Sequence, residues 1–261
     1  MSRFKLTVEY AGTRYSGWQI QKNARTVQGE IDQAIRNATG RSDFELYGAG
    51  RTDAGVHAVG QVAHLDIYTS IKPGALRHQL NDRLPSDIGI VRVDGVPHRF
   101  HARHDAVSRS YLYQIARRKT ALFKPYVWWI KEPLDIDRMR QAAASFIGLQ
   151  DFASFTADEP DQKSTRVMVE ALEIGEDGDL ILIRVVGSHF LWRMVRRVTG
   201  VLTAVGRGEL TPEQSASLLE DRSDVPATLT APASGLFLEG VYYRGEDGPG
   251  ALKAVVRLAR G

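Results

Sequence analysis

The chain has 261 residues, of which 43% are hydrophobic and 25% are charged. This composition is typical of a globular protein with one large domain or two small ones. No apolar run approaches the ~20 residues that a membrane-spanning helix needs, and the first residues lead into a strand pattern, so we expect no signal peptide. The chain has no cysteine, which excludes disulfides, thiolate zinc sites and cysteine nucleophiles and fits a cytoplasmic protein.

Positive charge is concentrated in two stretches of the chain. The net charge of +3 is by itself a weak indication of a polyanionic partner. Residues 96–119 contain six basic side chains and one acidic side chain, and residues 184–197 contain four arginines and no acid. Residues 151–179, in contrast, contain nine acidic and two basic side chains. A phosphate-binding groove requires such concentration, although a solvated basic face fits a charge run equally well.

The first hundred residues alternate between strand and helix patterns. Thr26 is a suitable N-cap for a helix whose apolar residues recur at helical spacing, and Gly40 ends that helix. A second helix is expected from Lys72 to Leu84, because Pro85 cannot continue it. Period-two alternation predicts strands over residues 4–10, 44–47, 61–68 and 88–93.

The second half repeats this order of patterns. The strand expected over residues 108–116 places Tyr111 and Tyr113 on one face. Asp135 is a suitable N-cap for a helix that Gly148 closes. An apolar stripe over residues 191–205 predicts another helix. Further strands are expected over residues 166–174 and 180–186, joined by a turn at 175–178, and over residues 235–243.

Strands and helices mix here without strict β-α-β alternation, which favours the α+β class with largely antiparallel sheets. The two halves resemble each other in the order of their elements, although no sequence repeat connects them. We therefore expect two similar domains, residues 1–105 and 106–261, each a mainly antiparallel sheet with flanking helices. The active-site cleft is expected between them.

The glycine-rich segment from Gly48 to His57 is the most informative part of the sequence. Its three glycines let the backbone adopt positive φ and let a ligand approach closely. Asp53 lies in the middle of the segment near Arg51, whose charge favours the ionised carboxylate, which is a nucleophile or a general base. The spacing fits neither a dinucleotide-binding loop nor a P-loop. A plain β-turn with a capping aspartate is the alternative explanation.

This segment resembles the signature loop of the tRNA pseudouridine synthase A family, and the resemblance spans almost the whole chain. Other stretches match the family in its order. The unmatched stretch 158–163 is expected to be a variable loop, and Arg197 stands where many members have asparagine. The matching stretches are residues 8–19, 26–28, 48–58, 60–62, 100–103, 109–113, 151–155, 194–196 and 235–238.

The resemblance implies an isomerase that converts uridine to pseudouridine in the anticodon stem-loop of tRNA, at positions 38–40, without any cofactor. It implies that Asp53 is the catalytic carboxylate and that Arg196 pairs with it, as a bidentate guanidinium can. Tyr111 matches the tyrosine that stacks on the target base, and Arg51 the arginine that fills the space of the flipped base. Leu238 is expected to line the floor of the pocket. Without the resemblance, Tyr111 is an ordinary cross-strand aromatic residue, Arg196 part of a solvated helix face, and Leu238 a core residue.

A target nucleotide in a stem must leave its stack, which costs on the order of a few kcal/mol. Phosphate contacts compensate for this cost and make binding sensitive to salt. Arg99, Arg103 and Arg109 are candidate RNA-binding residues, together with Arg117 and Lys119. The family likeness also implies a homodimer bridged by the RNA.

Two functions of other classes remain open. His98, His101 and His104 recur every three residues, a spacing that metal ligands often show. Their basic neighbours Arg99 and Arg103 oppose cation binding, so we expect no metal site. An RNA-binding module without catalysis predicts the same basic patches and aromatic residues. The role of Asp53 distinguishes it from an enzyme, because a pure RNA binder gains nothing from a carboxylate that repels phosphate.

Overall fold

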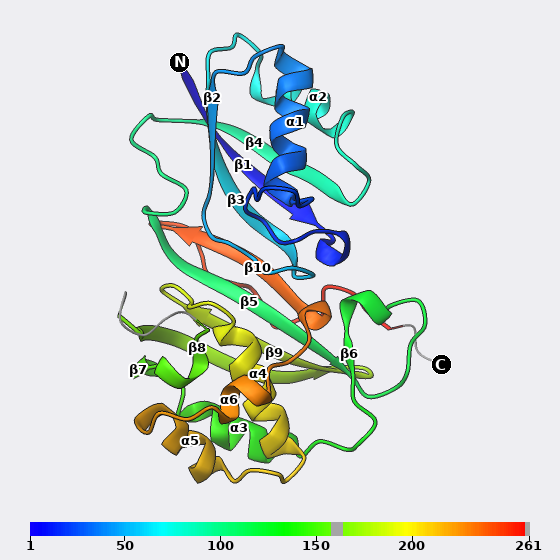
Figure 1. Cartoon of the computed structure of the whole chain (residues 1–261), viewed down its shortest axis with the longest axis vertical. Helices are drawn as coiled ribbons and strands as arrows, with labels where there is room; N and C mark the ends of the chain where they lie inside the picture. The colour runs from blue at the N-terminus through cyan, green and yellow to red at the C-terminus, as the bar shows by residue number, and fades with distance from the viewer. Residues whose placement is uncertain (158–163, 259–261) are drawn as a thin grey trace. The chain divides into compact units, whose positions relative to one another are not determined.

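The computed structural model describes residues 1–157 and 164–258, so the expected variable loop at 158–163 lies outside the described residues. The chain divides into two compact units (Figure 1). The first comprises Met1–Val107 and Phe237–Gly248, and the second comprises Ser108–Leu236 and Pro249–Gly261. Each contains a mainly antiparallel sheet and flanking helices, so the predicted α+β class is confirmed.

The sheet of the first unit is built around β1 (Ser2–Tyr10) and β3 (His57–Ile67), which pair antiparallel. The other side of β1 pairs antiparallel with β4 (Ile88–Val96). Two strands share the other edge of β3. The strand β2 (Phe44–Gly48) pairs with its C-terminal end, and β10 (Leu236–Tyr243) pairs in parallel with its first residues. The loop that joins β2 to β3 therefore ends beside β10.

Two helices, α1 (Val27–Thr39) and α2 (Pro73–Asn81), pack against each other in this unit. The hydroxyl of Thr26 accepts the Gly29 N–H, and Gly40 adopts left-handed backbone at the other end, so both predicted caps of α1 are confirmed. The helix α2 ends before the predicted Leu84. The side chain of Asn81 donates to the Ile90 carbonyl at 2.9 Å and accepts its N–H at 2.7 Å, so the helix end is tied to β4.

The sheet of the second unit has four strands in the order β5 (Ala106–Ala116), β9 (Leu180–Gly187), β8 (Arg166–Asp177) and β7 (Gly148–Asp151), all antiparallel. A short strand, β6 (Trp128–Trp129), pairs in parallel with the end of β5. The turn between β8 and β9 lies at Gly178 and Asp179 rather than at 175–178. Gly178 has a φ of 61°, which allows a turn shorter than the predicted one, so both strands are longer than the sequence pattern predicts.

Helices cover one part of this sheet and the C-terminal segment covers another. The helices α3 (Ile136–Ala144), α4 (Met194–Gly206) and α5 (Pro212–Glu220) pack on one another, and α3 packs on β8. The short α6 (Val225–Thr228) contacts α4. Residues 252–258 pack against a cluster that includes Leu112 and Leu182. Because both faces are covered, every residue of β9 is buried.

Two helix boundaries of the second unit differ from the prediction. Asp135 caps α3 by accepting the Arg138 N–H at 3.0 Å, as predicted, but α3 ends at Ala144 and Gly148 instead begins β7. The helix α4 begins at Met194, three residues later than its apolar stripe, because Arg193 has left-handed backbone with a φ of 62°. Leu191 therefore lies in the connection that precedes α4.

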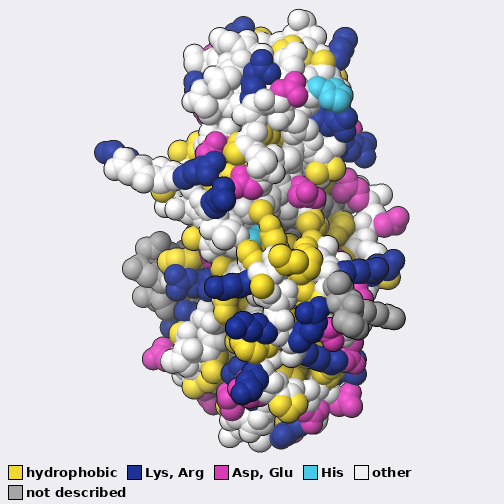
Figure 2. Space-filling model, turned by 90° about the vertical axis from the view of Figure 1, so that its right-hand side faces the viewer, with side chains coloured by type: hydrophobic (Ala, Val, Ile, Leu, Met, Phe, Trp, Pro, Cys, Tyr) yellow, Lys and Arg dark blue, Asp and Glu magenta, His cyan; other side chains and the backbone are white. Residues whose placement is uncertain are grey.

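Basic and apolar side chains are interleaved on the surface of the second unit. On the face that Figure 2 shows, Lys and Arg side chains surround exposed hydrophobic side chains of this unit. Within residues 1–157 and 164–258, no helix is long and apolar enough to cross a membrane.

Candidate active site

Asp53 lies in the loop of residues 49–56 that joins β2 to β3. Neighbouring backbone holds this loop at several points. The Ala49 N–H donates to Val62 O at 2.7 Å, and the Trp18 N–H donates to Thr52 O at 3.1 Å. The side-chain amide of Gln61 donates to Gly50 O at 3.1 Å. These bonds fix the first half of the loop to separate parts of the first unit.

Thr52 and Val56 are buried on either side of the half-buried Asp53. The Thr52 hydroxyl is 2.8 Å from the hydroxyl of buried Tyr10. A turn then brings the Val56 N–H to Asp53 O at 3.2 Å, with Gly55 in left-handed backbone. Because its neighbours on both sides are anchored inward, the carboxylate of Asp53 is held on a short, defined piece of backbone.

The segment of residues 11–18 packs closely beneath this loop. Gly17 has a φ of 92°, and a Cβ there would lie 2.5 Å from Thr52 O. A Cβ on Gly12 would lie 1.9 Å from Val56 O. No side chain fits at either position without movement of the backbone, so both glycines are required by close approach to the Asp53 loop.

Two other predicted site residues belong to the first unit. Arg51 is exposed in the same loop, two residues before Asp53. Leu238 is buried in β10, where it pairs with Ala58 just after the loop. Beside it, Phe237 stacks on His57 with ring centroids 4.9 Å apart. The parallel pairing of β10 with β3 therefore brings Leu238 to the end of the Asp53 loop.

Tyr111 and Arg109 lie on β5 in the second unit. The half-buried ring of Tyr111 packs edge-to-face against Phe190, with centroids 5.1 Å apart. The guanidinium of Arg109 donates to Ser188 O at 2.6 Å. Both contacts are with residues 188–193, which we call the 188–193 connection because they join β9 to α4. This connection therefore packs against one side of Tyr111.

Arg196 lies in the first turn of α4. Its Nε donates to Ala231 O at 2.7 Å, and its own carbonyl accepts the Ala231 N–H at 3.0 Å. Burial raises the pKa of Tyr113, and the positive charge of nearby Arg196 opposes this effect. Tyr113 is on the same face of β5 as Tyr111. The second unit therefore brings Tyr111, Arg109 and Arg196 to one region.

The structure identifies residues at both regions that the sequence analysis did not select. In the first unit these are Tyr10 and Trp18, whose contacts position the Asp53 loop. In the second unit they are Phe190, Trp192 and Arg193 of the 188–193 connection. The aromatic and basic run Ser-His-Phe-Leu-Trp-Arg was the available signal for the second set.

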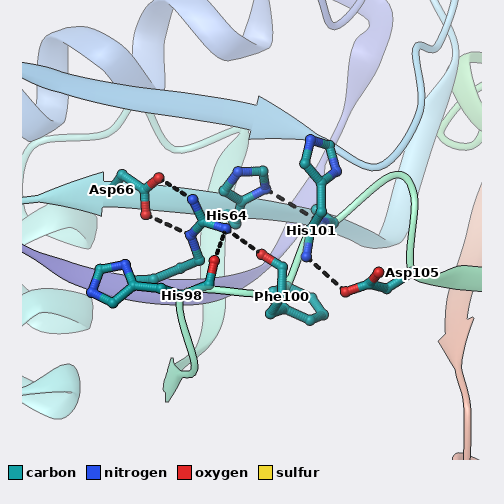
Figure 3. A network of polar contacts seen from close by, with 8 residues as sticks. His64, Asp66, His98, Phe100, His101 and Asp105 are labelled. Carbon is teal, nitrogen blue, oxygen red and sulfur yellow. Dashed lines mark hydrogen bonds and ion pairs between the residues drawn. The ribbon is translucent and has the colours of Figure 1, made fainter.

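The predicted RNA-binding residues Arg99 and Arg103 are exposed on the chain between β4 and β5. A polar network holds this chain to the sheet of the first unit (Figure 3). Arg3 forms an ion pair with Asp66 and donates to Phe100 O at 2.7 Å. The Ala102 N–H donates to Nδ1 of buried His64 at 3.2 Å. These bonds fix the backbone from which the two arginines project.

Two histidines of this region, His64 and His101, accept hydrogen bonds from the backbone. Nδ1 of His101 accepts the N–H groups of Arg103 and His104, at 3.1 and 3.3 Å. Among the residues that the structure describes, no three His, Cys, Asp or Glu side chains are placed to hold a metal ion. Of the three histidines that recur every three residues, His101 therefore binds neighbouring backbone.

The sequence that forms most of these two regions matches one known class of RNA-modifying enzymes. The family model described as tRNA pseudouridine synthase matches residues 6–105 and 142–244. The match includes Asp53, Arg196 and Leu238, whereas Tyr111 lies between the two matched stretches. It covers more than half of the chain, and the chain therefore belongs to the tRNA pseudouridine synthase family.

Relatives resemble the chain over nearly its full length. It is 40% identical over 248 residues to the tRNA pseudouridine synthase A of Agrobacterium fabrum, with 93% of each chain covered. It is 40% identical over 245 residues to the protein of that name from Thermoanaerobacter sp. strain X514, covering 93% of this chain and 100% of the relative. A solved archaeal box H/ACA Nop10–Cbf5 complex is a distant neighbour, with a TM-score of 0.38, 14% identity and coverage of 78% of this chain and 44% of that chain.

Proposed function

We propose that the protein isomerises uridine to pseudouridine in tRNA, with the carboxylate of Asp53 as the catalytic group. The observation that carries this proposal is the Asp53 loop. Half-buried Asp53 lies there between buried Thr52 and buried Val56, in a stretch that the family model matches. The reaction breaks an N-glycosidic bond, turns the base and rejoins it through carbon. No redox step occurs, so one carboxylate is sufficient and no cofactor is required.

The other site residues support the same chemistry. We assign Tyr111 as the ring that stacks on the target base, because its half-buried ring is oriented by Phe190. Arg196 is the proposed counter-ion of the catalytic carboxylate, since a guanidinium keeps its charge and binds carboxylates in bidentate fashion. Arg51 takes the place of the flipped base in the RNA, and Leu238 forms part of the floor beneath it.

The proposed substrate region is the anticodon stem-loop, at positions 38–40 of the tRNA, as the family likeness implies. Arg99, Arg103 and Arg109 contact its phosphates, which makes binding sensitive to salt. We further propose two similar domains, residues 1–105 and 106–261, with the active-site cleft between them. The protein acts as a homodimer in the cytoplasm.

The decisive experiment compares wild-type protein with Asp53→Asn on an unmodified tRNA transcript, without metal or nucleotide. Wild type should form pseudouridine in the anticodon stem. Asp53→Asn should form none while binding the tRNA at least as tightly, because the change removes a negative charge near phosphate. Asp82→Asn, an exposed aspartate of the same unit, is the matched control and should keep full activity.

Full activity in Asp53→Asn would disprove the proposed mechanism. Salt-sensitive binding without product from wild type would instead favour an RNA-binding protein that lacks catalysis. Mapping of the modified uridines on the same transcript tests the assignment to positions 38–40.

A further inference from the structure

The 188–193 connection carries an exposed aromatic side chain. Trp192 is 49% exposed, and its neighbours His189 and Arg193 are exposed as well. Single exposed apolar side chains are common on protein surfaces, so one exposed ring is not in itself a site. A binding role for Trp192 therefore needs support from its geometry and from nearby charge.

The backbone and a neighbouring cation hold Trp192 in place. The guanidinium carbon of Arg193 lies 5.0 Å from the centroid of the Trp192 ring, within cation–π range. The carbonyl of Trp192 accepts the Ala157 N–H at 3.0 Å. Arg193 has a φ of 62°, a left-handed backbone that residues with a side chain disfavour and that clusters at functional sites. The ring is thus presented at the surface in a defined position.

The stretch of sequence around Trp192 is positively charged. Residues 180–208 contain five arginines and no acidic residue. Three of them, Arg193, Arg196 and Arg197, lie next to Trp192 in the sequence. At the other end of the connection, Arg109 donates to Ser188 O and Phe190 packs on Tyr111, the proposed base-stacking residue. An aromatic ring among cations complements a nucleic acid, which offers flat bases and phosphates.

The same unit contains a second exposed tryptophan in different surroundings. Trp129 is 43% exposed, and Lys119 lies 5.8 Å from its ring centroid. The two basic residues before this lysine form ion pairs with acidic side chains, Arg117 with Glu176 and Arg118 with Asp179. Positive charge near Trp129 is therefore partly neutralised by these ion pairs. Trp129 serves as an internal control.

We propose that Trp192 stacks on an unpaired base of the RNA substrate, next to the region that receives the target uridine. This inference rests on the proposed function, because it takes the RNA as the substrate of the site formed with Tyr111 and Arg196. Arg193 orients the ring and contacts the adjacent phosphate.

The first test measures the affinity of the full chain for the tRNA transcript. Trp192→Ala should weaken binding about 10- to 100-fold, the effect of one lost base–aromatic stack, and raise KM. The slope of log K against log salt should stay unchanged, because no charge is lost. Arg193→Ala should instead reduce that slope by about one. Trp129→Ala should bind like wild type. Equal losses in Trp192→Ala and Trp129→Ala, or none in Trp192→Ala, would overturn the inference.

The second test uses tryptophan fluorescence, which does not depend on activity. Stacking on a base quenches an indole, so tRNA should quench the fluorescence of wild type and of Trp129→Phe. Trp192→Phe should lose most of this quenching while keeping its affinity within about threefold, since phenylalanine also stacks. Undiminished quenching in Trp192→Phe would disprove the stack even if Trp192→Ala did not fold.

Failure of this inference and failure of the proposed function are distinguishable. If wild type forms pseudouridine and the Trp192 variants behave like wild type, only the stacking is wrong. If wild type binds tRNA with Trp192-dependent quenching but forms no pseudouridine, the stacking is correct and the catalytic assignment is wrong. If tRNA causes no quenching at all, the exposed ring does not bind RNA, and a protein partner of this surface is the alternative.

Discussion

The Asp53 loop and the 188–193 connection hold their functional residues in opposite ways. In the first, polar contacts from Tyr10, Trp18 and Gln61 fix a short loop from the buried side. In the second, the side chains of Trp192 and Arg193 are exposed on a left-handed backbone. A reacting group needs a fixed position, whereas groups that bind RNA need to be accessible to its bases and phosphates. Changes around the loop should thus lower kcat, and changes in the connection should raise KM.

Arg196 should be the exception to this division, because it lies beside the connection but is proposed to act on the catalytic carboxylate. Arg196→Ala should lower kcat on the order of 100-fold, the usual cost of removing one preorganised electrostatic partner. Arg196→Lys should recover only part of the rate, since lysine lacks the planar fork that binds carboxylates. Single-turnover rates at saturating enzyme separate this effect from binding. A variant that changes only KM would place Arg196 among the RNA-binding residues instead.

Acid pH should weaken the attachment of the chain between β4 and β5. Burial, together with the positive charges of Arg3 and His101, lowers the pKa of His64 to about 4. In the unfolded chain this pKa is ~6.5. The unfolded state therefore binds more protons between these values, so the stability from His64 is complete above pH ~6.5 and is lost as the pH falls toward 4. The loss is on the order of 3 kcal/mol at most.

Denaturant unfolding between pH 7 and pH 4 checks this expectation. His64→Gln should flatten the pH dependence of the unfolding free energy, since glutamine does not titrate. His78→Gln, on the exposed surface of α2, should leave the slope as in wild type. An unchanged slope in His64→Gln would mean that other groups cause the acid sensitivity.

Gly17→Ala tests how strictly the Asp53 loop depends on close backbone approach. The new Cβ would meet Thr52 O at 2.5 Å, and the left-handed φ adds strain, so the variant should lose about 1–3 kcal/mol of stability. Its kcat should fall as well, because Thr52 precedes Asp53. Gly50→Ala is the matched control for stability, because a Cβ there meets nothing within 4 Å. Equal unfolding free energies in the two variants would contradict the packing argument.

Local patterns in the sequence predicted those features of the fold, such as helix ends, that depend on residues close together in the sequence. Thr26 and Gly40 were correctly assigned as the ends of α1, since a cap depends on residues three or four positions away. The pairing of β10 with the start of β3 was not predictable, because it joins residues about 180 positions apart. The turn at Gly178 was placed too early, since several nearby glycines and acids fit a turn equally well.

The same distinction applies to the candidate site. The Asp53 loop stood out because its glycines and its carboxylate are contiguous. The residues that anchor it did not, because Tyr10 lies 42 positions from Thr52 and looks like any strand residue. Trp192 was overlooked for a different reason. In the sequence it adjoins an apolar helical stripe, and only the left-handed backbone at Arg193 separates it from the helix.

Tyr10→Phe, compared with Tyr243→Phe, tests whether such a hidden anchor affects the chemistry as well as the fold. Each change removes one buried tyrosine hydroxyl. The hydroxyl of Tyr10 bonds to that of Thr52, and the hydroxyl of Tyr243 donates to the Ala102 carbonyl at 2.7 Å. Both should cost about 0.5–1.5 kcal/mol of unfolding free energy, the net value of one hydrogen bond. Only Tyr10→Phe should lower kcat, by a few-fold, because only Thr52 adjoins Asp53. Tyr243→Phe should change KM, since Ala102 lies beside Arg103. If both variants lose stability and neither changes kcat, the hydroxyl of Tyr10 supports the fold alone, and the position of Asp53 is set by the loop backbone.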